Sequence, residues 1–434
     1  MTASATQSPR APGRARKVGL QQQLTCPNCW HVFGPQDVLF IARHESLLGD
    51  LVAGPDALMR FRPSRFTTNG DALDPMGVTC SELACPRCHL AIPRPLIEMK
   101  PLFVSIVGSP GSGKSFFLTA STWMMRRSAM DLGLSFSDGD AGCNLQLHRS
   151  EEALFMAEDP EVPVTLDKTQ LAGGDLYQTV LLDGQPQTFP RPFQFTLAPT
   201  DVRARPDFPY RGLVLYDNAG EHFQPGQDTA AAPVTLHLSR SAAIFFIFDP
   251  TQDVGFRREQ VREKTESGQE STMTAPSLTR QEVIFHEMAG RVRQYRGLSQ
   301  DQAHDKPLVM VLAKADTWFD DPLFADEPLL ADPGRLDHPR INQASDRCRQ
   351  LLLKHCPQMV QSAEAFSHRV IYVPVSSVGT PPVRVGGKDS RVWGVKPRDI
   401  RPQWVTVPLL WTLDQSVPGM LAGEPETQTP GGDA

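Results

Sequence analysis

Short apolar runs that end in polar or glycine-containing sequence are the dominant pattern of this chain. Runs of about six residues with continuous apolar character are typical of strands that are buried on both faces of a parallel sheet. The runs are residues 102–107, 212–216, 242–248, 307–312 and 370–375.

Two further segments complete the pattern. Residues 192–197 are expected to form a strand that pairs antiparallel with the run ending before Asp217, and residues 278–295 show helical spacing of apolar positions such as Ile284 and Met288. The pattern predicts an α/β fold, with a mostly parallel sheet, helices on both faces and residues 242–248 as the central strand.

A glycine-rich turn follows the first apolar run directly. Its residues are Gly108, Ser109, Pro110, Gly111, Ser112, Gly113, Lys114 and Ser115. A buried strand, such a turn and a following helix aim backbone N–H groups at one point, where two or three phosphates can bind. Lys114 is expected to reach the β- and γ-phosphates, and the Ser115 hydroxyl to hold Mg²⁺. The segment predicts a nucleoside triphosphate site.

An acidic residue at the end of a second buried strand fits the same site. Asp217 begins the sequence Asp-Asn-Ala-Gly, which fits the Asp-x-x-Gly pattern of the switch element of GTPases. The carboxylate of Asp217 lies on the metal side in that element, and Gly220 offers its N–H to the γ-phosphate. A recombinase-type ATPase usually has Asp-Glu here, so this sequence favours GTP.

Two more elements follow strand ends and indicate guanine. Lys314 and Asp316 come after residues 307–312. A carboxylate at Asp316 can accept both the N1–H and the N2–H of guanine, a pair of donors that adenine lacks, while the stem of Lys314 packs on the base. Ser376 and Ser377 follow residues 370–375, in the place of an element whose backbone N–H reads guanine O6.

The order of these elements carries a resemblance. From about residue 100 to about residue 415 the chain resembles the translation-factor and Ras-like class of P-loop GTPases, which implies GTP or GDP and Mg²⁺ as ligands. One departure is Ala313, which stands where the family has Asn or Thr. Its missing side-chain hydrogen bonds are expected to weaken guanine binding, or to make it less selective, by about 1–2 kcal/mol.

A second departure concerns hydrolysis. Glu221 stands where Ras-like proteins have the glutamine that orients the attacking water, and its charge repels the γ-phosphate. His222 follows and can compensate, so Lys114, Glu221 and His222 are the catalytic candidates and hydrolysis is expected to be slow without a partner. Thr169 is the chosen switch I threonine, although an ordinary loop residue is an equal alternative.

Two Cys-Pro-x-Cys pairs near the N-terminus form the second strong motif. They are Cys26 with Cys29, and Cys85 with Cys88. Two residues between paired cysteines allow both thiolates to bind one tetrahedral ion, so four of them predict a closed structural Zn²⁺ site. The alternatives are disulfides or free buried cysteines. Disulfides are less expected, because no signal peptide precedes the cysteines. Further possible ligands are Cys80, His31 and His89, whereas Cys143, Cys348 and Cys356 are expected to be core residues.

Composition fits a cytoplasmic protein and sets the expected domains. The formal net charge of −6 argues against a chain that coats nucleic acid, and the longest apolar run is too short to span a bilayer. The expected organisation is a disordered basic tail (1–22), a zinc-ribbon domain (23–98), a P-loop GTPase domain with insertions (99–416) and a disordered tail (417–434).

The combination of a zinc ribbon with these motifs resembles the bacterial double-GTPase families, which occur in conflict and signalling gene clusters. The resemblance implies a partner GTPase or effector protein and a role as a nucleotide-gated switch. Two alternatives stay open. One is a P-loop ATPase or phosphotransferase. The other is a zinc-ribbon nucleic-acid adaptor with a structural nucleotide, which the arginine-rich residues 60–65 would support.

Overall fold

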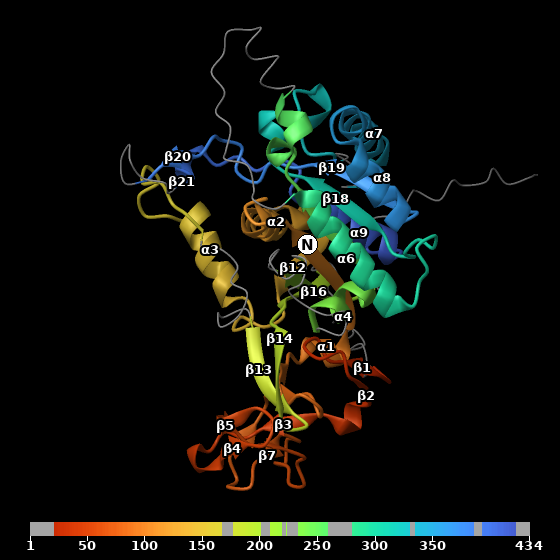
Figure 1. The fold of residues 1–434 in the computed structure, drawn as a ribbon. Coiled ribbons are helices and arrows are strands. Elements are labelled where there is room, and N and C mark those ends of the chain that lie inside the picture. Colours follow the sequence, from red (N-terminus) through yellow and green to blue (C-terminus); the bar gives the residue numbers. More distant parts are fainter. Residues whose placement is uncertain are drawn as a thin grey trace, which may run out of the picture.

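A seven-stranded mixed sheet forms the centre of the fold (Figure 1). The computed structural model describes residues 21–166, 177–200, 209–218, 223, 233–258, 280–329, 335–385 and 393–421. In spatial order the strands are β12 (Leu134–Asp138), β15 (Phe193–Pro199), β16 (Arg211–Asp217), β11 (Lys100–Gly108), β17 (Ala243–Phe248), β18 (Leu308–Leu312) and β19 (Val370–Pro374).

Six of these strands run in the same direction, and five of them are neighbours that pair in parallel. β11 pairs in parallel with both β16 and β17, and β17, β18 and β19 continue in the same direction. β15 runs antiparallel to both of its neighbours, β12 and β16, so the pairing predicted for residues 192–197 is confirmed. β11 occupies the middle of the sheet and β17 lies beside it, so the expectation that residues 242–248 form the central strand is wrong.

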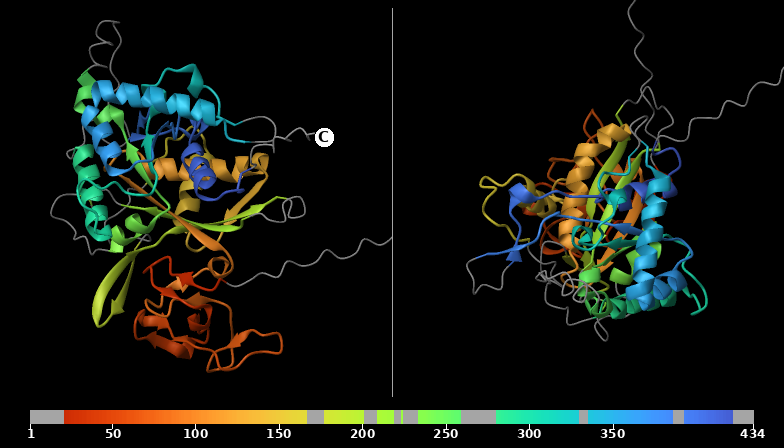
Figure 2. Two further views of the ribbon diagram at one scale, coloured as in Figure 1. Left: turned by 90° about the vertical axis from the view of Figure 1, so that its right-hand side faces the viewer. Right: turned by 90° about the horizontal axis from the view of Figure 1, so that it is seen from above.

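Helices cover both faces of the sheet. Adjacent strand residues point to opposite faces, and Phe245 and Phe246 of β17 show which helix lies on each. The ring of Phe245 contacts Phe117 of α2 (Lys114–Ser128), whereas the ring of Phe246 contacts Phe285 of α6 (Gln281–Arg296). Figure 2 shows α2 and α6 on opposite sides of the strands. The α6 bounds agree with the helical spacing of residues 278–295.

The remaining elements surround this core. The other α-helices are α1 (Pro95–Glu98), α3 (Leu145–Phe155), α4 (Pro233–Arg240), α7 (His338–His355), α8 (Pro357–Phe366) and α9 (Val407–Ser416). The short strands of the N-terminal region are β1 (Leu24–Thr25), β2 (Val32–Phe33), β3 (Leu39–Ile41), β4 (Leu48–Asp50), β5 (Gly54–Leu58), β6 (Arg60–Phe61), β7 (Ala72–Leu73), β8 (Thr79–Cys80), β9 (Leu83–Ala84) and β10 (Ala91–Ile92). Two hairpins, β13 (Tyr177–Leu182) with β14 (Gln185–Pro190) and β20 (Val383–Arg384) with β21 (Trp393–Gly394), lie outside the central sheet.

The β13–β14 hairpin connects the central fold to the N-terminal region. Figure 1 shows it reaching from the sheet to the strands β3–β5. The N–H of Leu181 donates to the carbonyl of Val52 at 2.8 Å, and Val180, Leu182 and Phe189 are buried in an apolar cluster shared with that region. The N-terminal region is therefore packed on the larger fold.

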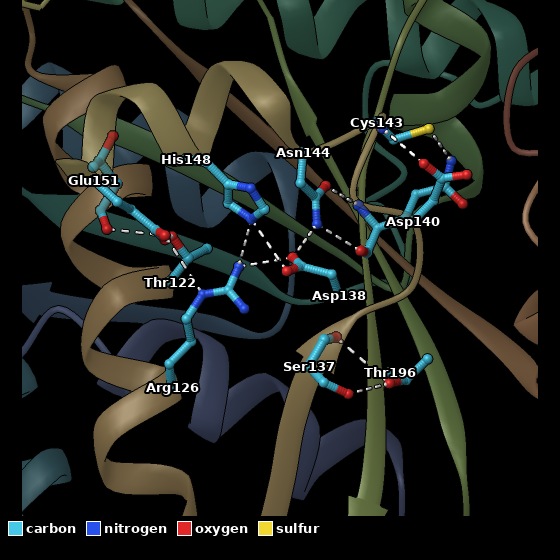
Figure 3. Close-up of polar contacts among 12 residues, drawn as sticks. Thr122, Arg126, Ser137, Asp138, Asp140, Cys143, Asn144, His148, Glu151 and Thr196 are labelled. Atoms are coloured by element: carbon cyan, nitrogen blue, oxygen red, sulfur yellow. Dashed lines mark hydrogen bonds and ion pairs between the residues drawn. The ribbon is translucent and has the colours of Figure 1, made fainter.

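A polar cluster fixes the edge strand β12, which the sequence pattern did not predict (Figure 3). Asp138 at the end of β12 accepts hydrogen bonds from Arg126 of α2 at 2.7 Å and Asn144 at 2.6 Å, and lies 3.1 Å from His148 of α3. Burial alone would raise the pKa of Asp138, but these donors and charges hold it below its usual value. Arg126 also lies 3.5 Å from Glu151, so one guanidinium joins two carboxylates on different elements.

The expectations for the chain ends and for the remaining cysteines are confirmed only in part. Residues 1–20 and 422–434 lie outside the described ranges, but Val417, Met420 and Leu421 are buried in the core, so the packed chain continues past residue 416. Cys348 and Cys356 are buried as expected, whereas Cys143 is half-buried. In the described ranges no helix has the length and apolarity to cross a bilayer.

His304 gives the fold a specific pH dependence. Its side chain is fully buried, its ring stacks on Phe366 at 5.3 Å, and burial lowers its pKa to about 4. In the unfolded chain this histidine becomes protonated near pH 6.5, whereas in the folded chain it stays neutral until about pH 4. The free energy of unfolding therefore falls as pH drops from about 6.5 to about 4. We expect His304→Phe to remove roughly 2–3 kcal/mol of this loss between pH 7.5 and 4.5, measured by urea unfolding. The exposed His368→Asn is the control, and equal pH profiles in both variants would contradict the assignment.

Candidate functional site

The polar elements singled out in the sequence lie at the carboxyl ends of neighbouring strands. Gly108 ends β11, Asp217 ends β16, Lys314 follows β18 and Ser376 follows β19. Because these strands are parallel, their carboxyl ends meet at one edge of the sheet, which is where α/β proteins bind ligands. Four other candidates, Gly220, Glu221, His222 and Thr169, lie outside the described residues.

The glycine-rich turn has a backbone that only glycine supports. Gly111 and Gly113 have φ of 76° and 96°, in the left-handed region that disfavours side chains. A Cβ on Gly108 would lie 2.6 Å from the carbonyl oxygen of Ile247 in β17. The loop therefore stays tight against the sheet before α2 begins at Lys114.

The Lys114 side chain is buried inside this loop. Its ammonium donates to the carbonyl oxygens of Gly108 at 2.7 Å and Ser109 at 3.0 Å, and the residue is 7% exposed. Gly113, at the N-cap of α2, has no side chain to cap the first turn, so no side chain of that residue covers the backbone N–H groups at the start of α2. The arrangement concentrates positive charge and N–H dipoles, which is the donor set that an anion needs.

Asp217 is positioned beside β11 by strand register. Its Cα pairs with Ile106, two residues before Gly108. The next residue, Asn218, is fully buried, and both its backbone N–H and its Nδ2 donate to the carbonyl of Ile106, at 3.2 and 2.9 Å. These bonds fix the start of the segment that follows Asp217.

Asp249 is a buried carboxylate to which the sequence pattern assigned no role. It follows β17, is fully buried, and accepts the ammonium of Lys314 at 2.6 Å. Its other oxygen accepts the N–H and hydroxyl of Thr251 at 3.0 and 2.6 Å. The available signal was an aspartate after an apolar run, but its partner lies 65 residues away in the sequence.

The turn after β17 also contacts the glycine-rich loop. Gln252 donates from Nε2 to the carbonyl of Gly111 at 2.9 Å. Gln281 of α6 exchanges two hydrogen bonds with the backbone of Asp249, at 2.8 and 2.9 Å, and accepts the Ser109 hydroxyl at 3.4 Å. We name Asp249, Gln252 and Gln281 the bridging group, because they connect the glycine-rich loop with the loop of Lys314.

Asp316 and Ser376 contact each other. The Ser376 hydroxyl donates to Asp316 Oδ1 at 2.5 Å and accepts the N–H of Gly379 at 2.9 Å. Ser376 is fully buried, Ser377 is half-buried and Asp316 is exposed beside an open cavity of 730 Å³. Two elements that are 60 residues apart thus form one polar corner.

The four predicted cysteines come together in one buried cluster. Sγ of Cys26 lies 3.7 Å from that of Cys88, and Sγ of Cys29 lies 3.6 Å from that of Cys85. Sulfurs around a tetrahedral Zn²⁺ with bonds of about 2.3 Å are about 3.8 Å apart, so the spacing fits this ion. In the described part of the chain, this is the only group of three or more His, Cys, Asp or Glu side chains close enough to hold a metal.

The backbone around the cysteines also fits a metal. The N–H groups of Asn28 and Arg87 lie 3.4 Å from the sulfurs of Cys26 and Cys85, where they can stabilise thiolates. Burial raises the pKa of the Cys26 thiol well above its usual value, so four buried thiolates need a cation to offset their charge. All four positions are used by sulfur, which makes the site structural in type.

The other possible metal ligands have different partners. His89 Nδ1 lies 2.8 Å from Asp50 Oδ1, the His31 ring stacks on Phe33 at 5.8 Å, and Cys80 contacts the carbonyl of Val78. The four-cysteine set is therefore complete without them.

The cysteine cluster is packed directly against the central sheet. Trp30, next to Cys29, contacts Phe103 of β11 and Tyr216 of β16, with ring centroids 4.2 and 5.9 Å apart. The Tyr216 hydroxyl donates to the carbonyl of Pro27 within the first cysteine pair at 2.5 Å, and its ring stacks on His237 of α4 at 4.4 Å. Tyr216 immediately precedes Asp217, so the strand β16 both contacts the cysteine cluster and ends at the carboxyl edge of the sheet.

The arginine-rich segment stabilises its own region. Arg60 donates to the carbonyl of His89 at 2.9 Å, Arg62 pairs with Asp37 at 2.9 Å, and Arg65 donates to the carbonyl of Asp74 at 2.8 Å. These contacts give the three arginines a structural role within the N-terminal region.

Comparison with known proteins assigns no family to this chain. No protein-family model matches the chain, and no curated protein is significantly similar to it.

The cysteine cluster predicts one bound zinc per chain. We expect Cys26→Ser to lose that zinc and to make residues 21–98 sensitive to protease, because binding free energy at such a site is folding free energy. Metal analysis and limited proteolysis measure both effects. Cys80→Ser, at a buried cysteine outside the cluster, is the matched control, and equal zinc content in the two variants would exclude the site.

The bridging group predicts a large cost for loss of the Asp249 charge. Asp249→Asn keeps the shape but removes the anionic partner of Lys314, and we expect about 2–3 kcal/mol of destabilisation in urea unfolding. Asp37→Asn at the exposed pair with Arg62 should cost less than about 1 kcal/mol. Similar costs for the two variants would show that the buried pair contributes nothing specific.

Proposed function

We propose that this chain binds GTP and GDP with Mg²⁺ at the carboxyl edge of the sheet, and acts as a slowly hydrolysing molecular switch with a partner protein. The observation that carries the proposal is the glycine-rich loop between β11 and α2, with the Lys114 ammonium enclosed in it. The parallel strands β16, β11, β17, β18 and β19, with β15 antiparallel at one side, support a GTPase-like arrangement.

Phosphate binding rests on groups that already surround the loop. The Lys114 ammonium would exchange its two carbonyl partners for oxygens of the β- and γ-phosphates, joined by N–H groups at the start of α2. Ser115 and Asp217 are the residues that would hold Mg²⁺, which neutralises charge on the phosphates. The buried position of Asp217 beside β11 supports this assignment.

Guanine recognition rests on the corner formed by Asp316 and Ser376. The Ser376 hydroxyl occupies one acceptor position of Asp316 Oδ1 and orients the carboxylate. Each carboxylate oxygen has a second acceptor position, so Asp316 can still accept the two N–H groups of guanine. Adenine would leave that carboxylate unsatisfied, which is the basis of a preference for guanine.

The bridging group offers a replacement for the side chain that Ala313 lacks. In the GTPases that the chain resembles, an Asn or Thr at this position ties the base-reading loop to the phosphate loop. Here Asp249 holds Lys314 at 2.6 Å, while Gln252 of the same turn holds Gly111 at 2.9 Å. The tie between the two loops therefore passes through the turn after β17, and the penalty expected from Ala313 is smaller than its side chain alone suggests.

Slow hydrolysis and a partner remain part of the proposal. Glu221 in place of a glutamine cannot donate a hydrogen bond to the γ-phosphate, and its charge opposes that group. His222 can supply the missing donor. A protein that depends on a second protein for fast hydrolysis keeps its triphosphate form long enough to act as a switch.

Competition for labelled GTP in the presence of Mg²⁺ tests the proposal. We expect GTP to bind more tightly than ATP by roughly 2–4 kcal/mol, because Asp316 makes two hydrogen bonds that adenine cannot make. Lys114→Ala should abolish triphosphate binding, and Asp316→Asn should shift preference toward xanthosine triphosphate, whose C2 oxygen accepts from the amide.

Two controls make this result specific. Lys354→Ala and Asp131→Asn remove exposed charges outside the proposed contacts and should leave GTP binding unchanged. GTP binding by Lys114→Ala at wild-type affinity would reject the phosphate site. Equal competition by ATP and GTP, with no effect of Asp316→Asn, would instead favour an ATP-dependent protein.

A further inference from the structure

An open cavity of 390 Å³ lies at the amino edge of the central sheet. Lys100 and Arg211 begin β11 and β16, and residues just before β17, β18 and β19 complete the wall together with the end of α9. β11 has nine residues, so at about 3.3 Å per residue this cavity is roughly 26 Å from the glycine-rich loop. It is therefore separate from the proposed nucleotide site.

The charges around this cavity are strongly unbalanced. Five cations line it, against the single carboxylate of Asp305; they are Lys100, Arg211, Arg240, Lys306 and Arg369. Of the five, only Lys306 pairs with that carboxylate, at 3.3 Å, and Asp305 also pairs with Arg296 at 3.2 Å. The local charge is positive although the whole chain has a formal net charge of −6.

The cations are held close together by the fold. Lys100 and Arg211 are direct Cα partners in neighbouring parallel strands, a placement that is destabilising for like charges. Three arginines are oriented by neutral oxygens: Arg211 by the carbonyl of Tyr210 at 2.9 Å, Arg240 by that of Trp30 at 3.3 Å, and Arg369 by Gln415 Oε1 at 3.1 Å. Such bonds orient the guanidinium groups, and no carboxylate of the described residues pairs with these three arginines.

Burial adds to this cost. It lowers the pKa of Arg211, which shows that its positive charge has lost part of its hydration. A bound anion would return favourable interactions to several of these groups at once. Leu102, Phe103 and Val417, which are buried residues, also line the cavity.

We propose that this amino-edge cavity binds a small, soluble, multiply charged phosphate compound. Its volume lies within the range of small-molecule sites, roughly 300–1,000 Å³, and is too small for a nucleic-acid duplex. Arginine presents a planar pair of donors that matches phosphate oxygens, and three arginines with two lysines suit a ligand with two or three phosphoryl groups.

Calorimetry with inorganic tripolyphosphate tests this cavity. Lys114→Ala serves as the parent protein, so that the glycine-rich loop contributes as little as possible. We expect this parent to bind tripolyphosphate, and the added changes Lys100→Gln and Arg369→Gln to weaken binding at least tenfold. The matched control, Arg43→Gln with Lys354→Gln, removes two exposed cations elsewhere and should change affinity less than twofold. Affinity should fall steeply as salt is raised.

The remaining arms separate other anions. Lys100→Gln with Lys306→Gln is a second cavity variant, and thermal unfolding verifies that each variant folds. No binding to the Lys114→Ala parent, or an equal loss in cavity and control variants, overturns the proposal. So does an oligoglutamate peptide that binds as tightly with the same dependence on the cavity, or attachment only to vesicles that carry phosphorylated lipid headgroups.

Discussion

The parallel pairing of β11 with β16 and β17 is the constraint on which the rest of the structure depends. Once these strands share a direction, every connection must leave the carboxyl edge and return to the amino edge. The carboxyl edge then receives Gly108, Asp217 and Asp249 from three adjacent strands. The amino edge receives Lys100 and Arg211 in the same way, so one pairing rule produces two separate polar regions at opposite edges of a single sheet.

Close packing around β11 explains why its end is so strictly defined. Gly108 approaches the backbone of β17 too closely for any side chain, and Val104 and Val107 above it are fully buried. The loop that follows cannot relax outward without breaking this contact. The Lys114 ammonium is therefore positioned in part by the sheet, because one of the carbonyls to which it donates belongs to Gly108, the last residue of β11.

The sequence predicted what depends on local pattern. Continuous apolar runs located the five parallel strands, glycine spacing located the tight loop before α2, and the cysteine pairs located the cluster at Cys26 and Cys88. Contacts between distant segments were beyond reach. Nothing in an aspartate after a strand indicates that it will hold Lys314, and nothing in residues 177–190 indicates a hairpin that packs on Val52. The edge strand β12 was missed because its alternation of serine with apolar residues is short and weak. Its position depends on the buried contacts of Asp138.

The contact of Tyr216 with the first cysteine pair has a thermodynamic consequence. One ring lies between the carbonyl of Pro27 and the residue that ends β16. A ligand that displaced this strand end would also disturb the hydrogen bond to the first cysteine pair. By thermodynamic reciprocity, a metal ion held by the cysteines would then change the affinity for that ligand by the same factor.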